Sequence, residues 1–193
     1  CLIVPIEIRS ENQGPGINGQ SKKIISLDPG VRTFMTGYDP EFKCIEWGKS
    51  DIRRVYRLCS SYDKLQSKMT LIKNKKRYNR MDRAKKKIIK KIRCLIDEVH
   101  KKLVKWLCEE YNIILLPIFE TQKMIIKNKR RIRSKTARAM LTWSHYRFQQ
   151  RLINKSREYP WCKVIICDEQ YTSKTCGHCG VIKQNLNSSK IFK

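Results

Sequence analysis

Residues 24 to 36, which read IISLDPGVRTFMT, constrain the fold of this chain most. An apolar strand is predicted to end on Asp28, a turn at Pro29 and Gly30 to follow, and a second strand to begin at Val31. Two interpretations of Asp28 are open. An Asp before Pro-Gly is a common turn residue, because its carboxylate can bond the backbone two residues on. Alternatively, an acid at the end of a buried strand can hold a metal ion.

The charge of the chain indicates what such a metal ion would act on. The 193 residues carry 43 Lys and Arg against 17 Asp and Glu, a formal net charge of +26. Self-repulsion of this size is tolerated mainly when a polyanion neutralises it, which points to nucleic acid. Membrane binding is the competing cause, but the sequence has no run of about 20 apolar residues and no signal-peptide pattern at its start. No membrane partner is expected.

The order of apolar patterns predicts an α/β domain. Residues 1–20 are expected to be an edge strand and a flexible Gly-rich connector, 21–170 the main domain, and 171–193 a separate segment. Residues 42–47 add a third strand to the two around Asp28, forming an antiparallel meander.

Two more strands are predicted later in the chain. Residues 112–119 (NIILLPIF) are apolar throughout, as in a strand buried on both faces, and they lead directly to Glu120. Residues 161–167 form the second of these strands, and Asp168 and Glu169 follow it.

A helical hairpin is predicted over about residues 50–111. Apolar residues step by threes and fours from Ile52 to Ile72 and from Ile88 to Trp106, and a nearly solid run of charge at 73–87 joins the two helices. Residues 49–105 hold 21 Lys and Arg against five acids, a net charge of +16. A charge run often marks only a solvated helix face, but such a face normally mixes signs, so nucleic-acid contact is favoured. The candidate contacts are Lys73, Lys75, Lys76, Arg77, Arg80, Lys85 and Lys86.

A second cationic segment covers residues 121–157, with 12 Lys and Arg and no acid. Residues 123–135 are predicted to be a loop. One helix follows, with Ser134 or Thr136 as its N-cap. Its buried face would hold Ala137, Leu141, His145, Phe148 and Leu152, with His145 at the edge of the core. Candidate phosphate contacts are Arg130, Arg131, Arg133, Arg147 and Arg151, the last two acting as a fork.

Asp28 and Glu120 together suggest a magnesium site, because each closes an apolar strand. Carboxylate oxygens suit Mg²⁺, which takes its remaining positions from water and substrate phosphate. A pair of such ions can stabilise the attacking and leaving oxygens of phosphodiester hydrolysis. A third acid is usually needed, and Asp168 and Glu169 are the local candidates. A turn or a salt bridge explains those two residues at least as well.

Eight of the nine cysteines fall into two groups. Cys176 and Cys179, in CGHCG, have the spacing of one zinc knuckle, but structural zinc needs four ligands, and His178 is poorly placed to be a third. A loop with two free thiols is the alternative. Six others stand singly in apolar patterns and are predicted to be buried thiols in a reducing compartment, the cytoplasm or nucleus. They are Cys44, Cys59, Cys94, Cys108, Cys162 and Cys167.

Four motifs in order resemble one family. ISLDPGVRTF, LLPIFETQKM, MLTWSHYRFQQRL and DEQYTSKTCGHCG are similar to the TnpB family of insertion sequences, its Fanzor relatives and small type V CRISPR nucleases. The resemblance implies an RNase H-like (RuvC) mixed sheet with the basic hairpin inserted and a zinc ribbon. It also implies a transposon-associated, RNA-guided DNA endonuclease. By this resemblance Asp28 is the first catalytic acid, Glu120 the second, and Cys176 and Cys179 are half of the zinc site. The hairpin would lie beside guide RNA or the heteroduplex.

The sequence departs from the family pattern at its end. Family members carry a second C-x-x-C after a segment like 189–193, and then a third catalytic Asp, with which Asp168 and Glu169 do not align. We therefore expect an incomplete chain with a truncated zinc ribbon, a remnant that binds DNA and RNA but is deficient in cleavage. Two alternatives are open: an active Mg²⁺-dependent endonuclease completed by another polypeptide, or a non-functional partial gene product.

Overall fold

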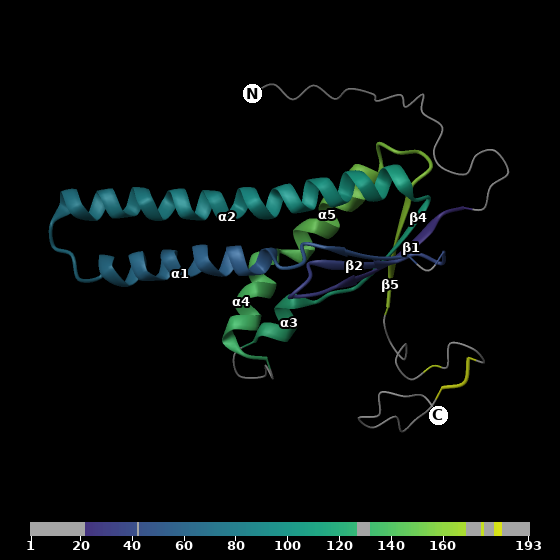
Figure 1. Cartoon of the computed structure of the whole chain (residues 1–193), viewed down its shortest axis with the longest axis horizontal. Coiled ribbons are helices and arrows are strands. Elements are labelled where there is room, and N and C mark those ends of the chain that lie inside the picture. Colours follow the sequence, from purple (N-terminus) through teal and green to yellow (C-terminus); the bar gives the residue numbers. More distant parts are fainter. Residues whose placement is uncertain (1–21, 42, 127–131, 169–174, 176–179, 183–193) are drawn as a thin grey trace.

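Five strands form one mixed sheet at the centre of the chain (Figure 1). The computed structural model describes residues 22–41, 43–126, 132–168, 175 and 180–182. The strand order is β3-β2-β1-β4-β5. The strands are β1 (Ile24–Pro29), β2 (Met35–Tyr38), β3 (Cys44–Trp47), β4 (Ile113–Pro117) and β5 (Lys163–Cys167). The first three pair antiparallel, while β4 runs parallel to β1 and to β5. The predicted mixed sheet is thus confirmed.

The turn after β1 is longer than predicted. The second strand begins at Met35 rather than Val31, because residues 30–34 form a closed turn in which the Gly30 amide donates to the Phe34 carbonyl at 3.1 Å. A Cβ atom at Gly30 would lie 2.5 Å from the backbone oxygen of Thr33. This close approach requires glycine.

Helices α1 (Asp51–Met69) and α2 (Lys75–Glu110) form the hairpin, which extends well beyond the sheet in Figure 1. The prediction that residues 73–87 form a charged linker is wrong. Helix α2 already begins at Lys75, where the side chain of Asn74 caps it by accepting from the Arg77 amide at 3.1 Å. At 1.5 Å per residue, α2 is about 54 Å long. Its charged first third is therefore a rigid rod.

Three shorter helices follow β4. They are α3 (Thr121–Ile125), α4 (Ser134–Trp143) and α5 (His145–Ser156). Two predictions fail here. Helix α3 occupies part of the expected loop, and the expected single helix is broken at Ser144, whose φ of 54° is left-handed. Ser134 is the first helical residue, and Arg133 holds the N-cap position without a side-chain cap. The break leaves Leu141 55% exposed.

The core lies between the sheet and the helices, around Phe34. Its ring packs against those of His100, Trp143, His145 and Phe148, with ring centroids 4.9 to 5.2 Å apart. All five side chains are at most 4% exposed. Truncating a buried Phe or Trp to alanine typically costs about 3–5 kcal/mol, so the three such rings of this cluster contribute strongly to stability. The core thereby joins the turn after β1 to α2, α4 and α5.

The cysteine prediction is right for half of the single thiols. Cys59, Cys108 and Cys162 are buried, while Cys44 and Cys94 are exposed and Cys167 is half-buried. All six are free. None of the helices in the described ranges combines the length and hydrophobicity needed to cross a membrane.

Candidate metal site and nucleic-acid interface

Asp28 and Glu120 leave the sheet at the same edge. Strands β1 and β4 are neighbours and parallel, with Ser26 opposite Leu115. The same register continued by two residues sets Asp28 level with Pro117, and Glu120 follows three residues later. Because the carboxyl ends of parallel strands meet at one edge, two segments 92 positions apart in the sequence bring their acids to the same edge of the sheet.

Both acidic side chains face solvent. Buried and exposed residues alternate along β1, so Leu27 and Pro29 enter the core and Asp28 points away from it. Glu120 is the N-cap residue of the short helix α3, and its Oε2 atom lies 2.7 Å from the Nζ atom of Lys123. The Glu120 side chain remains 49% exposed. Both carboxylates are accessible to an ion or a phosphate.

His145 lies in the core directly between the two acid-bearing segments. Its ring stacks on Phe34 at 5.0 Å with an interplanar angle of 14°, and it meets the edge of Phe119, the neighbour of Glu120, at 4.7 Å. Burial lowers the pKa of His145 to about 4, and the backbone of Gly30 only partly opposes this. Neither ring nitrogen has a hydrogen-bond partner of good geometry among the described residues. The neutral ring therefore links the turn after Asp28 to the segment before Glu120. The sequence gives no signal for this contact beyond the aromatic setting WSHYRF.

The remaining predicted metal ligands are Asp168, Glu169, Cys176 and Cys179. Asp168 follows β5, the neighbour of β4, and its side chain is exposed. Within the described ranges, no group of three His, Cys, Asp or Glu residues is placed to hold a metal ion. Glu169 and the cysteines Cys176 and Cys179 lie outside those ranges. Thr175 and Ile182, which flank the two cysteines, form an antiparallel bridge.

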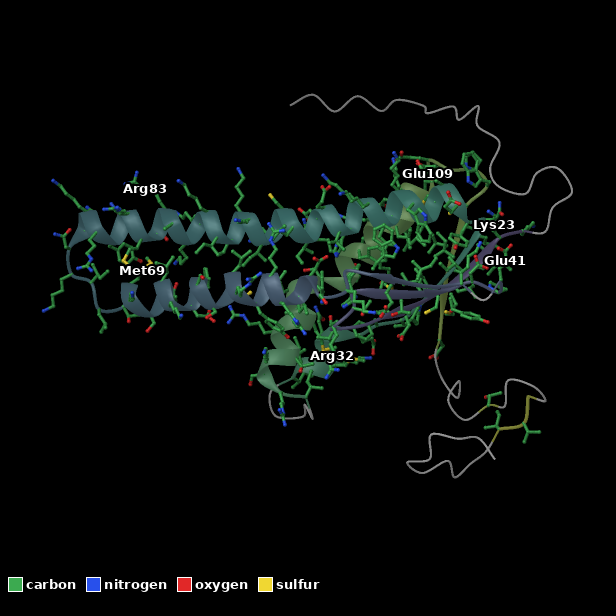
Figure 2. All side chains as sticks on the ribbon, viewed as in Figure 1. Lys23, Arg32, Glu41, Met69, Arg83 and Glu109 are labelled. Atoms are coloured by element: carbon green, nitrogen blue, oxygen red, sulfur yellow. The ribbon has the colours of Figure 1, made fainter. Side chains whose placement is uncertain are left out.

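The predicted nucleic-acid contacts of the hairpin differ in whether their charged groups already bond another side chain of the protein. Figure 2 shows nitrogen-tipped side chains projecting along both helices. Lys85 is held inward, since its Nζ atom donates to Gln66 of α1 at 3.0 Å and lies 3.5 Å from Asp82. Lys86 pairs with Asp82 at 2.8 Å. Five others are exposed and form no ion pair with another described residue: Lys73, Lys75, Lys76, Arg77 and Arg80.

Arg147 and Arg151 of α5 do not form the expected open fork. Both guanidinium groups bond the carboxylate of Asp97 in α2, at 2.7 and 2.9 Å. Partial burial alone would raise the pKa of Asp97, but the hydrogen bond and charge of Arg151, with the charge of Arg147, lower it. Arg133 is exposed at the start of α4, whereas Arg130 and Arg131 lie outside the described residues.

These features define a strongly cationic α/β domain in which a mixed sheet presents two acids beside a long basic hairpin. In sequence the chain is similar to TnpB-like proteins over most of its length. Residues 145–193 match the family described as Cas12f1-like, TNB domain. The TnpB-like protein L79 of Acanthamoeba polyphaga mimivirus is 27% identical over 179 residues, covering 90% of this chain and 34% of that protein.

Two further comparisons extend over most of the chain. Protein A625R of Paramecium bursaria Chlorella virus 1, which carries a provisional transposase designation, is 28% identical over 195 residues. That alignment covers all of this chain and 42% of the viral protein. A solved structure of a Cas12f1–sgRNA–target DNA complex shares the fold with a TM-score of 0.54 and 15% identity, over 86% of this chain and 33% of that one. The chain thus spans less than half the length of the relatives it matches.

Proposed function

We propose that this chain is an RNase H-like (RuvC) domain that binds DNA and guide-type RNA. The observation that carries the proposal is the row of exposed cations on the first turns of α2, including Lys75, Lys76 and Arg80, which form no ion pair with another described residue. A rod with this charge contacts phosphates rather than bases, so it suits a nucleic acid recognised by shape. The strand order and the partners in the Cas12f1 complex support this reading.

Asp28 and Glu120 fit a magnesium ion. Two exposed carboxylates at one edge supply the oxygen ligands that Mg²⁺ prefers, and water or substrate phosphate supplies the rest. When bound, the ion would offset the charge of a phosphate placed beside the hairpin. Asp168 follows β5 at the same edge, but no three acids among the described residues are placed to hold one metal ion, and we propose that the site supports binding and is deficient in cleavage.

Cys176 and Cys179 would supply two of the four ligands of a structural zinc ion, a half-site of a zinc ribbon. The bridge between Thr175 and Ile182 supports this proposal, because it brings together the two ends of the segment that holds them. The three buried free thiols of the main domain favour a reducing compartment, the cytoplasm or the nucleus.

The binding proposal is tested by the salt dependence of affinity. Fluorescence anisotropy would follow a labelled RNA–DNA heteroduplex between low and physiological salt. Each phosphate neutralised by Lys or Arg releases counterions, so affinity should fall steeply as salt rises. Changing Lys75, Lys76 and Arg80 to Gln should flatten the slope by about three phosphate contacts. A flat response in the wild type would contradict the proposal.

Magnesium-dependent DNA cleavage is the second candidate, favoured by the shared sheet edge of Asp28 and Glu120. Wild type and Asp28→Asn would be compared on single-stranded DNA with Mg²⁺, with metal binding measured separately by calorimetry using Mn²⁺. We expect metal binding that Asp28→Asn weakens, and equal background cleavage in both proteins. Cleavage by the wild type above that background would establish the enzyme.

A further inference from the structure

Two buried thiols, those of Cys108 and Cys162, lie against each other at the base of the hairpin. Cys108 belongs to the last turn of α2, and Cys162 immediately precedes β5. Both side chains are part of the hydrophobic core, and a hydrogen bond joins the two sulfur atoms. The two residues are 54 positions apart in the sequence, so the fold assembles a dithiol from two distant segments.

Backbone contacts on both sides of the pair fix its geometry. The Nε1 atom of Trp161, the residue before Cys162, donates to the carbonyl oxygen of Cys108 at 3.1 Å. The amide of Lys163, the residue after Cys162, donates to the carbonyl oxygen of Asn112 at 2.7 Å. The end of α2 and the start of β5 are therefore bonded to each other on either side of the thiols, and the contact between the sulfurs follows from the fold.

The two thiols are not equivalent. Cys162 is 8% exposed, whereas Cys108 is fully enclosed at 0%. The hydrogen bond from the Cys108 thiol lowers the pKa of Cys162, against the opposing effect of burial, and the same bond raises the pKa of Cys108. The thiolate is the nucleophilic form of cysteine, so the more accessible thiol is also the one better able to attack. The enclosed thiol keeps its proton and lies in position to attack its neighbour's sulfur.

We propose that Cys108 and Cys162 form a redox-active dithiol, which closes to an intramolecular disulfide when the protein meets hydrogen peroxide. The inference is independent of the proposed nucleic-acid function. Buried cysteines often serve only as small apolar side chains, and such thiols are inert to oxidants. The partner sulfur and the partial exposure of Cys162 distinguish this pair from that case.

The oxidation proceeds in two balanced steps. The thiolate of Cys162 attacks one peroxide oxygen, the O–O bond breaks, and the departing hydroxide takes a proton from solvent to become water. Cys162 is then a sulfenic acid. The sulfur of Cys108 attacks the sulfur of Cys162, the S–O bond breaks, and the departing hydroxide takes the Cys108 proton to become a second water. The two thiols lose two electrons, which the peroxide gains.

The disulfide would tie the base of the hairpin to the edge strand of the sheet. It links the end of α2 directly to the residue before β5. Cross-linking residues 54 positions apart restricts the unfolded chain, so oxidation should raise the Tm by about 5–10 °C. A dithiol reductant should reverse the change.

The test oxidises the reduced, folded wild-type chain with hydrogen peroxide in native buffer. Remaining thiols are then alkylated in urea, and the protein is digested without reductant for mass mapping. We expect a linked pair of peptides carrying Cys108 and Cys162, about 2 Da lighter than the two reduced peptides together. Dithiothreitol should separate them. Peroxide treatment of the protein in urea is the control, and there this pairing should not be favoured over others.

Three single variants assign the roles of the thiols. In Cys108→Ala, dimedone should trap the sulfenic acid on Cys162, because the sulfur that would displace it is absent. In Cys162→Ala, Cys108 should remain unlabelled. Cys59→Ala is the matched control, since it removes a buried thiol of α1, 6% exposed, and should still form the link. Circular dichroism and thermal unfolding show that each variant is folded before oxidation.

The wild-type measurement decides the proposal without any variant. If peroxide oxidises the exposed Cys44 and Cys94 while the folded wild type gives no link between Cys108 and Cys162, the dithiol is only structural and the proposal fails. A link that forms equally well in urea would show that the fold does not assemble it. Dimedone on Cys108 instead of Cys162 would overturn the order of attack, and a lower Tm after oxidation would overturn the fit of the disulfide to the native fold.

Discussion

The Nη1 atom of Arg151 lies 3.3 Å from the Nδ1 atom of His100, inside the seam between α2 and α5. The other ring nitrogen of His100, Nε2, lies 2.9 Å from the carbonyl oxygen of Trp143. A neutral imidazole satisfies both contacts, with Nε2 donating and Nδ1 accepting from the guanidinium. A proton on Nδ1 would instead face a positive charge. The contact therefore requires a neutral histidine in the folded protein.

This requirement predicts that stability falls in mild acid. Burial, followed by the charge of Arg151, lowers the pKa of His100 to about 4, and burial lowers that of His145 to about 4. In the unfolded chain both titrate near 6.5, so the unfolded state takes up protons first as pH falls. The stabilisation is complete above about pH 6.5 and is lost toward pH 4. We expect a loss of about 2 kcal/mol per histidine between pH 7 and pH 5, measured by urea unfolding.

The control for this pH effect is His145→Phe, which keeps an aromatic ring against Phe34 and Phe119. Because one of the two buried histidines is then absent, the fall in unfolding free energy between pH 7 and pH 5 should be about half that of the wild type. An unchanged pH dependence would mean that His145 does not titrate in this window.

The buried thiol of Cys108 should be unreactive in the folded protein. The hydrogen bond between Cys108 and Cys162 raises the pKa of the Cys108 thiol, and burial acts in the same direction. Iodoacetamide attacks the thiolate, so Cys108 should be protected by both its pKa and its lack of exposure. Exposed Cys44 and Cys94 should be alkylated in native buffer, as followed by peptide mass mapping. Unfolding in urea is the positive control for Cys108 labelling, and rapid labelling without urea would contradict its burial.

Gly30→Ala should destabilise the domain through the turn after Asp28. The new Cβ atom would lie 2.5 Å from the Thr33 carbonyl oxygen, so the backbone must shift. We expect a loss of about 1–3 kcal/mol in unfolding free energy, the usual cost of forced overpacking. Thr33→Ala, which keeps the carbonyl and changes only a half-buried side chain, should cost less than about 1 kcal/mol. An unchanged unfolding free energy in Gly30→Ala would show that the turn can shift without cost.

The ion pair between Asp63 of α1 and Arg138 of α4 should contribute little stability. Arg138 donates to both carboxylate oxygens, one of them at 2.9 Å, but the side chains are 50% and 41% exposed. A double-mutant cycle with Asp63→Ala and Arg138→Ala should give a coupling of about 0.5–1 kcal/mol that shrinks as salt rises. A coupling that salt leaves unchanged would indicate that the pair is less accessible to water than its exposed fractions imply.

Local patterns predicted the sheet and the hairpin well, because their signals lie within single segments. The apolar run at 112–119 and the helical steps from Ile52 required no distant partner to interpret. The break at Ser144 could not be found this way. Trp143 is fully buried, and its Nε1 atom donates to the Val31 carbonyl at 2.9 Å. Its own carbonyl oxygen accepts from His100. Contacts with two distant segments therefore fix the break between α4 and α5.

The shared edge of the strands that carry Asp28 and Glu120 was predictable to the same degree. Two acids closing apolar strands indicated a shared edge, and the pairing of β1 with β4 provides one. The state of Arg147 and Arg151 was not predictable, since Asp97 lies 50 residues away from Arg147 and on a helix whose packing partner was unknown. Long-range ion pairs of this kind decide which cations remain free for phosphate.

The length of α2 gives the hairpin a mechanical role. No residue of α2 before Ile96 is fully buried, so its first 21 residues, about 31 Å at 1.5 Å per residue, are supported mainly by α1. Over that lever, a rotation of about 5° at the base displaces the charged end by about 3 Å, half the spacing between successive phosphates of a strand. Packing at the seam with α5 therefore governs where the distant lysines come to rest.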